Sequence, residues 1–248
     1  MIRLLVSVRS VDEALVAARG GADFIDLKEP GQGALGGLPV DEIVAIVAAL
    51  RVAGRPQPVS ATIGDVAAGE ADEVLRRVQA VAACGVDYVK VGLAREPGAR
   101  ELLDRLAMCG APVIPVFIGD RGIDDAVFAH ALGKRFPGVM ADTADKAAGC
   151  LFDAVSVLAL ARFVMRARAA GTMVGLAGAL RLKHLPRLAG LAPDFAGFRS
   201  AVCAGARDGR LEPALLAGLG EALRRAQAPM ARPSPPSSSE RMRASSAL

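Results

Sequence analysis

Eight short apolar segments recur along this chain, and a stretch with helical spacing of apolar residues follows each of them. The apolar segments cover residues 4–8, 24–28, 58–64, 88–93, 113–119, 138–143, 172–177 and 195–202. The helical stretches cover residues 11–19, 38–50, 71–83, 101–108, 124–132, 151–170, 180–188 and 213–226. Most of the segments are apolar on both faces, as parallel strands covered by helices are. The alternation therefore predicts an α/β protein, a single (β/α)8 TIM barrel with parallel strands.

An open doubly wound sheet is the second fold that this pattern allows. Such sheets usually have fewer strands, and the glycine-rich dinucleotide loop is missing after the first segment. The length of 248 residues and the 52% of hydrophobic residues match one barrel. We expect the catalytic barrel to cover residues 1–228. Residues 229–248 are rich in proline, serine and arginine, and we expect a disordered tail there.

The charge and cysteine patterns narrow the classes of partner. The net charge is only +4, and no aromatic residues interleave with the arginines, so we expect anionic metabolites rather than nucleic acid as partners. Four cysteines without C-x-x-C spacing and two histidines predict no metal site, no cofactor and reduced thiols in the cytoplasm. No apolar run is long enough for a membrane span. Helix faces rich in alanine and valine permit a homo-oligomer.

A weak internal repeat supports the barrel. In three places a helix ends in small residues, an aspartate follows and a strand begins, at Asp23, Asp87 and Asp194. Aligning these aspartates places further residues at two common levels of their strands. The first level holds Asp26, Lys90 and Gly197, and the second holds Lys28, Gly92 and Arg199. All six share one parity, so we predict that they face the same side.

Polar residues gather at the carboxyl ends of the expected strands, where TIM barrels carry their working groups. The candidates are Asp26, Lys28, Ser60, Thr62, Asp65, Lys90, Asp142, Thr143, Lys146 and Arg199. The chain has only five lysines, and Lys28, Lys90 and Lys146 are among these candidates. Lysine, unlike arginine, becomes a nucleophile once burial or neighbouring cations lower its pKa. The pattern favours carbonyl chemistry through a Schiff base.

Structural explanations stay open for the same lysines. Lys28 could pair with Asp26, Lys90 could belong to a buried ion pair, and Lys146 could be an exposed loop residue. Gly178, Gly197 and Arg199 lie after the seventh expected strand and on the eighth, where barrels commonly bind phosphate, although glycine also marks tight turns. We expect His130 and His184 to be ordinary surface or capping residues.

Taken together, these motifs resemble one family, the (5-formylfuran-3-yl)methyl phosphate synthases of methanofuran biosynthesis. The matching stretches are residues 4–7, 20–28, 60–65, 87–93, 142–146, 151–153, 176–178 and 197–199. The resemblance implies a lyase that condenses two glyceraldehyde 3-phosphate molecules with loss of one phosphate and two waters. It implies that Lys28 forms the Schiff base, that Lys90 accepts a proton, and that Asp26, Asp142 and Lys146 complete the polar centre. It implies no metal. Ser60, Thr62, Asp65, Gly178, Gly197 and Arg199 are the candidates for binding the triose phosphate.

One departure from the family pattern follows Lys146. The family often has an acidic residue and then glycine there, whereas this chain has Ala147-Ala148-Gly149, which leaves the shape of the loop open. Two other functions also stay open. Asp26-Leu27-Lys28 resembles the D-x-K strand end of the orotidine decarboxylase group, which uses no Schiff base. A barrel that binds a phosphorylated metabolite without catalysis is the other alternative.

Overall fold

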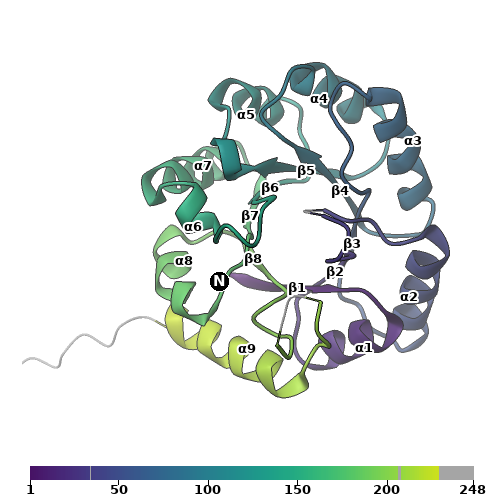
Figure 1. The fold of residues 1–248 in the computed structure, drawn as a ribbon, viewed down its shortest axis with the longest axis vertical. Helices are drawn as coiled ribbons and strands as arrows, with labels where there is room; N and C mark the ends of the chain where they lie inside the picture. Colours follow the sequence, from purple (N-terminus) through teal and green to yellow (C-terminus); the bar gives the residue numbers. More distant parts are fainter. Residues whose placement is uncertain (34, 206–207, 229–248) are drawn as a thin grey trace, which may run out of the picture.

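In the computed structural model, which describes residues 1–33, 35–205 and 208–228, the apolar segments form a closed barrel of parallel strands in the order β1 to β8. Helices surround the barrel on the outside (Figure 1). The expected (β/α)8 fold is confirmed, and the expected tail at 229–248 lies outside the described residues. The strands are β1 (Arg3–Val8), β2 (Phe24–Leu27), β3 (Val59–Thr62), β4 (Tyr88–Leu93), β5 (Val113–Ile118), β6 (Gly138–Asp142), β7 (Met173–Leu176) and β8 (Phe195–Phe198).

The helices follow the strands in the order that the sequence predicts. They are α1 (Val11–Arg19), α2 (Val40–Val52), α3 (Ala71–Ala82), α4 (Ala99–Met108), α5 (Asp125–Leu132), α6 (Leu151–Ala154), α7 (Val157–Ala169), α8 (Leu185–Leu191) and α9 (Pro213–Gln227). Two 3₁₀ turns, η1 (Gly119–Arg121) and η2 (Leu182–His184), lie after β5 and before α8. The helices bury their apolar faces against the outer face of the barrel, where most of the core lies.

Three expected boundaries were wrong. The helix expected at 151–170 is divided into α6 and α7, because Val155 is extended and the Ser156 hydroxyl accepts a hydrogen bond from the N–H of Ala159 to cap α7. The helix expected at 180–188 begins as η2, and α8 starts with Pro186 in its first turn. The last strand ends at Phe198 instead of residue 202, because the chain turns there and Val202 N–H bonds to Arg199 O.

The repeated aspartates have a common structural role. Each donates its backbone N–H to a residue of the preceding strand and accepts, with its carboxylate, the N–H of that same residue. The pairs are Asp23 with Leu4 (2.8 and 2.7 Å), Asp87 with Val59 (2.8 and 2.7 Å), and Asp194 with Val174 (2.8 and 2.8 Å). These reciprocal bonds fix the start of β2, β4 and β8 against β1, β3 and β7. In β6, Pro137 occupies the matching position, and a proline has no N–H for such a pair.

The interior of the barrel holds a second, smaller apolar cluster. The rings of Phe24 and Phe195 have centroids 5.5 Å apart. The other members from the strands, or from the residue directly after one, are Leu5, Ile114, Val116, Met140 and Ala177. One further member, Leu35, comes from the connection between β2 and α2. This apolar filling leaves the carboxyl ends of the strands for polar side chains.

Candidate active site

A cavity opens at the carboxyl ends of the strands, inside the barrel. Its lining combines charged side chains with an apolar wall and with the loops after β7 and β8. The lining residues are Leu5, Ser7, Asp26, Lys28, Pro30, Leu35, Lys90, Met140, Asp142, Lys146, Gly178, Gly197, Arg199 and their neighbours Ala177, Ala179, Leu180, Phe198 and Ser200. Five of the six repeat residues line this cavity, as their predicted common facing requires: Asp26, Lys28, Lys90, Gly197 and Arg199. The sixth, Gly92, is not in the lining, but a Cβ atom there would lie 2.8 Å from Leu35, which is.

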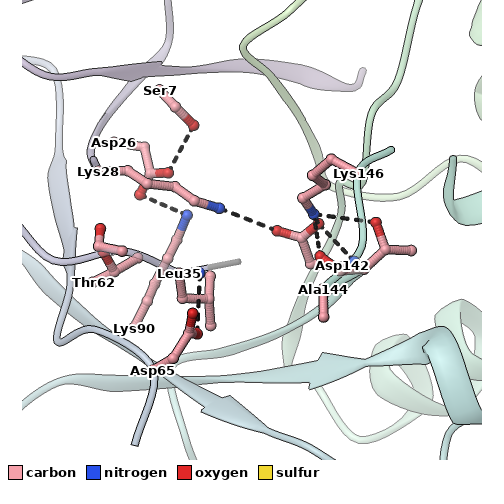
Figure 2. A network of polar contacts seen from close by, with 12 residues as sticks. Ser7, Asp26, Lys28, Leu35, Thr62, Asp65, Lys90, Asp142, Ala144 and Lys146 are labelled. Carbon is pink, nitrogen blue, oxygen red and sulfur yellow. Dashed lines mark hydrogen bonds and ion pairs between the residues drawn. The ribbon is translucent and has the colours of Figure 1, made fainter. Parts of the chain in front are cut away.

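One ion pair joins β2 and β4 in the cavity. The Lys90 ammonium lies 2.7 Å from Asp26 Oδ1, and both side chains are almost fully buried. Asp26 also accepts hydrogen bonds from Ser60 (2.7 Å) and Ser7 (2.9 Å), so neighbouring strands orient the carboxylate from both sides. Figure 2 shows Lys28 and Lys90 pointing into the same space. The alternative in which Lys28 pairs with Asp26 is not what the structure shows.

Lys28 faces the other side of the barrel instead. Its ammonium lies 3.5 Å from Asp142 Oδ2 at the end of β6, and Lys146 bonds to the second oxygen of the same carboxylate (Figure 2). Lys146 also donates to the carbonyl of Thr143 and, at 3.2 Å, to its hydroxyl. The three lysines and two aspartates thus form one network across the barrel mouth.

The pKa of Lys28 reflects this environment. Burial lowers the pKa from its ordinary value to about 8, Asp142 opposes this, and the ammonium of Lys146 lowers it further. For Asp142, burial alone would raise the pKa, but Lys146 and Lys28 outweigh it and hold the pKa below its usual value. Lys28 is therefore the amine that reaches its neutral, nucleophilic form near physiological pH, next to a carboxylate that stays ionised.

Three predicted substrate ligands lie outside the cavity lining: Thr62, Asp65 and Ser60. The Thr62 hydroxyl donates to Gly36 O at 2.8 Å, and Asp65 accepts the N–H of Leu35 at 3.2 Å. Both residues hold the connection between β2 and α2 in place. Ser60 also misses the lining and contacts Asp26 instead.

Arg199 lines the cavity, but its guanidinium is directed at Glu13 of α1. Both terminal nitrogens donate to the Glu13 carboxylate, and they also donate to the carbonyls of Ser7 and Gly209. Glu13 is buried, which would raise its pKa, but Arg199 reverses this and the pKa is lowered. This pair was not predictable from the sequence, because Glu13 has the position of an ordinary acidic residue in the first turn of a helix.

The two glycines after β7 and on β8 are places of close approach. Gly178 has φ +111°, and a Cβ atom there would lie 3.0 Å from Thr143 Oγ1. A Cβ at Gly197 would lie 3.1 Å from the Cβ of Ala177 and 3.2 Å from Met140 Cε, inside the cavity. Each glycine therefore leaves room that a side chain would fill, and backbone groups border the cavity there.

The loop after β6 has a defined shape despite its departure from the family pattern. Asp120 of η1 accepts the N–H groups of Ala144 (2.6 Å) and Asp145 (2.9 Å). Asp145 in turn accepts those of Ala147 (2.9 Å) and Ala148 (3.0 Å). The carboxylate of Asp120 thus supports the loop that carries Lys146.

The two histidines fit their predicted structural roles. His184 accepts the N–H of Arg181 at 3.0 Å with Nδ1, but it is buried instead of exposed, with Nε2 3.7 Å from Cys150 Sγ. Burial lowers the pKa of His184 and raises that of the Cys150 thiol, so both are neutral at physiological pH. His130 lies at the end of α5, 2.8 Å from Asp104.

No group of three or more histidine, cysteine or acidic side chains in residues 1–33, 35–205 and 208–228 is arranged to hold a metal ion. Within the same ranges, no helix combines the length and the hydropathy of a membrane-spanning segment.

Sequence reasoning missed the residues that orient the charged ones. Ser7, Glu13 and Leu35 lie in or beside the network, yet none was a candidate. Ser7 could have been found, because it lies near the end of the first strand on the side that faces Asp26. Glu13 and Leu35 could not, since their neighbours are distant in the sequence.

The chain matches the family described as 4-HFC-P synthase over residues 4–219. A protein from Methylorubrum extorquens is 40% identical over 223 residues, covering 90% of this chain and 92% of the relative. Proteins from Methanopyrus kandleri and Archaeoglobus fulgidus, both named (5-formylfuran-3-yl)methyl phosphate synthase, are 37% and 34% identical. They cover 81% and 90% of this chain, and 89% and 99% of the relatives.

Solved structures support the fold. Phosphoribosyl anthranilate isomerase from Thermus thermophilus has a TM-score of 0.63 at 19% identity, covering 90% of this chain and 99% of that one. For 3-hexulose-6-phosphate synthase from Salmonella typhimurium, the TM-score is 0.59 at 17% identity, with 91% and 98% covered. At these identities the likeness concerns the barrel alone.

Proposed function

This chain belongs to the 4-HFC-P synthase family, and from that premise we propose that it condenses two glyceraldehyde 3-phosphate molecules into (5-formylfuran-3-yl)methyl phosphate. The atoms balance: two trioses minus one phosphate and two waters give the furan product. The observation that carries the proposal is the convergence of Lys28 and Lys90 on one cavity, each beside its own carboxylate.

The first step is imine formation at Lys28. The amine attacks a triose phosphate carbonyl, and water leaves as the C=N bond forms. A pKa of about 8 supports this role, because a useful fraction of the amine is neutral near pH 7. Asp142 then lies beside a cationic iminium, in the position where it now balances the ammonium of Lys28.

The second step is proton removal from the carbon next to the iminium. Lys90 accepts this proton in its neutral form, and the C–H electron pair forms an enamine with the iminium as electron sink. Its 2.7 Å contact with Asp26 supports the role, because the carboxylate stabilises the ammonium that results. Ser7 and Ser60 keep Asp26 oriented during this transfer.

The third stage joins the carbons and forms the ring. The enamine carbon attacks the aldehyde of the second triose, and the resulting alkoxide takes a proton, a role that we give to the ammonium of Lys146 in the same cavity. Loss of phosphate and of two waters, with hydrolysis of the imine, then gives the aromatic product. The cavity borders formed by Gly178 and Gly197 are where we propose the phosphate groups bind.

The test combines product analysis with covalent trapping. We expect the purified chain to convert glyceraldehyde 3-phosphate into a product with furan absorbance and the expected mass, releasing one phosphate per furan. Borohydride added during turnover should attach the triose skeleton to Lys28. The matched control is Lys134→Arg, which changes a lysine that pairs with Asp104 outside the cavity. It should leave both results intact, whereas Lys28→Arg should abolish both.

Binding of triose phosphate without phosphate release would instead indicate a barrel that binds its ligand without catalysis. Decarboxylation of orotidylate would indicate the D-x-K group. In Lys90→Arg the charge beside Asp26 remains but the base is lost, so turnover near that of the unaltered chain would exclude the role given to Lys90.

A further inference from the structure

Leu35 occupies an unusual place, since it enters the barrel from a loop. It is almost fully buried, at 2% exposure, and belongs to the inner apolar cluster whose other members come from the strands or directly follow one. It also lines the cavity together with Lys28 and Lys90. A buried leucine in the same cavity as the two lysines of the proposed mechanism needs an explanation beyond filling the core.

The strand below Leu35 makes room for it. The second level of the repeat holds Lys28 directly after β2, Arg199 directly after β8 and, by the same spacing, Asp142 at the end of β6, while β4 carries Gly92 there. A Cβ atom at Gly92 would lie 2.8 Å from Leu35 Cδ1. Leu35 therefore occupies the space above Gly92, the one position of this level without a side chain. Its apolar group lies where the other three positions carry charged side chains.

The loop backbone holds Leu35 on both sides. Its N–H bonds to Asp65, and the next carbonyl, that of Gly36, accepts from Thr62 Oγ1 (2.8 Å) and from the N–H of Glu29 (2.9 Å). The bond from the Glu29 N–H to the Gly36 carbonyl joins the two ends of the loop. Thr62 and Asp65, expected at the substrate, thus fix the residue that reaches the cavity.

An apolar side chain at this place changes the chemistry open to the bound triose. The enamine on Lys28 has two fates: it adds to a second aldehyde, or its electron pair expels phosphate from the third carbon. The second fate gives, after proton shift and hydrolysis of the imine, methylglyoxal and phosphate. The atoms of one triose phosphate balance in that route, and no oxidant or reductant is needed. Free volume and water beside the enamine favour it.

Resting on the function proposed above, we propose that Leu35 is a specificity-determining residue, whose side chain excludes water from Lys28 and Lys90 and directs the enamine to condensation instead of phosphate loss. Thr62, Asp65 and Gly92 act through it, the first two by holding its backbone and the third by giving it space.

The test measures product partition in Leu35→Ala against a matched control. Leu38→Ala shortens a leucine of the same connection that packs in the outer core and does not line the cavity. We expect Leu35→Ala to raise the ratio of methylglyoxal to furan product by about tenfold, while Leu38→Ala leaves it unchanged. Methylglyoxal formed with Lys28→Arg gives the uncatalysed background to subtract. Leu35→Met should keep the native ratio, and Leu35→Val provides a smaller truncation if Leu35→Ala does not fold.

A double variant separates volume from loop stability. Gly92→Val adds an apolar side chain from β4 to the space that Leu35→Ala empties. Gly92 does not have a positive φ, so valine causes no backbone strain there. Partition in Leu35→Ala/Gly92→Val should return toward the native ratio, which a loss of loop order alone would not produce. An unchanged ratio in Leu35→Ala would overturn the inference and leave the furan synthesis standing.

A second measurement tests whether Leu35 excludes water from Lys28, and it does not depend on furan synthesis. It therefore still applies if the unaltered chain makes no furan, which is the result that would refute the proposed function. Glycolaldehyde is trapped on Lys28 with cyanoborohydride at a series of pH values, and the labelled fraction is measured by mass spectrometry. This fraction reports how much of the Lys28 amine is neutral at each pH. Truncation of Leu35 admits water and stabilises the ammonium, so the midpoint should move upward by roughly half a unit or more. A midpoint that matches that of Leu38→Ala would overturn the role of Leu35.

Discussion

Lys28 shares its cavity with two other lysines and two aspartates, but burial is the main cause of its depressed pKa. With Lys28, Lys90 and Lys146 all protonated, the five groups carry a net charge of +1, and loss of the Lys28 proton makes the cluster neutral. The Lys28 ammonium lies 3.5 Å from Asp142, whereas the Lys90 ammonium lies 2.7 Å from Asp26. Burial thus brings Lys28, the nucleophile of the proposed mechanism, toward its neutral form near pH 8.

The pH dependence follows from this arrangement. In the proposed mechanism neutral Lys28 is the nucleophile, so kcat/KM should rise about tenfold per pH unit below a midpoint near 8 and level off above it. Lys146→Met removes a cation that lowers the pKa of Lys28, so the midpoint should move to higher pH. Asp142→Asn removes a carboxylate that raises it, so the midpoint should move to lower pH. Rate profiles of both variants check the two directions, and shifts of the same sign would contradict the electrostatic explanation.

For single residues, the sequence predicted which side chains line the cavity better than it predicted which of them form ion pairs. The scarcity of lysine and the shared parity of Asp26, Lys28 and Lys90 selected three side chains that line one cavity in the structure. The pairing itself was not predictable, because it depends on which carboxylate lies opposite across the barrel. Glu13 shows the limit most clearly, since its partner Arg199 lies 186 positions away.

Among the structural elements, the loop between β6 and α6 has the clearest consequence for activity. Asp120→Ala should remove the two hydrogen bonds that support Ala144 and Asp145, and so loosen Lys146. We expect kcat to fall about tenfold, with a loss of about 1 kcal/mol in the free energy of unfolding. Asp120→Asn keeps one carbonyl oxygen and should recover part of kcat, as steady-state kinetics would show.

Asp124 provides a matched control for this prediction. It accepts two backbone N–H groups, those of Ala126 (2.9 Å) and Val127 (3.0 Å), but it caps α5 and does not line the cavity. Asp124→Ala should lower stability to a similar extent, about 1 kcal/mol, without lowering kcat. If both variants lose kcat equally at matched stability, Asp120 has no positioning role.

Elements were predictable where one face decides their conformation. Strand β4 was expected at 88–93, and the structure gives Tyr88–Leu93, because Val89, Val91 and Leu93 alternate along it and all three pack in the outer core. The helix expected at 151–170 divides because one serine side chain caps a new helix, which periodicity does not report. Loop residues were least predictable: Thr62 and Asp65 reach a backbone 26 and 30 positions away, and only the folded barrel brings these groups together.

The whole molecule combines a repeated architecture with a site that departs from the repeat. An aspartate directly precedes three of the four even-numbered strands, and each of these aspartates forms two hydrogen bonds with one residue of the strand before it. The same spacing that sets these starts also carries charged residues to the opposite end of the barrel. The aspartates that hold the strands together and the charged residues of the cavity therefore follow the same sequence spacing. The aspartates lie at the amino ends of the strands and the lysines at the carboxyl ends.

This division predicts separable effects of mutation. Asp23→Ala, Asp87→Ala and Asp194→Ala each leave a strand N–H without its carboxylate, and each should lower the free energy of unfolding by about 1 kcal/mol. The three sites share no partner, so the triple variant should lose the sum, measured by urea unfolding at pH 7. Because the charged network lies at the other end of each strand, kcat should stay within about twofold in every single variant. A single variant that keeps its stability but loses kcat would mean that the repeat shapes the site directly, and that the barrel transmits strain along β2, β4 or β8 to the lysines.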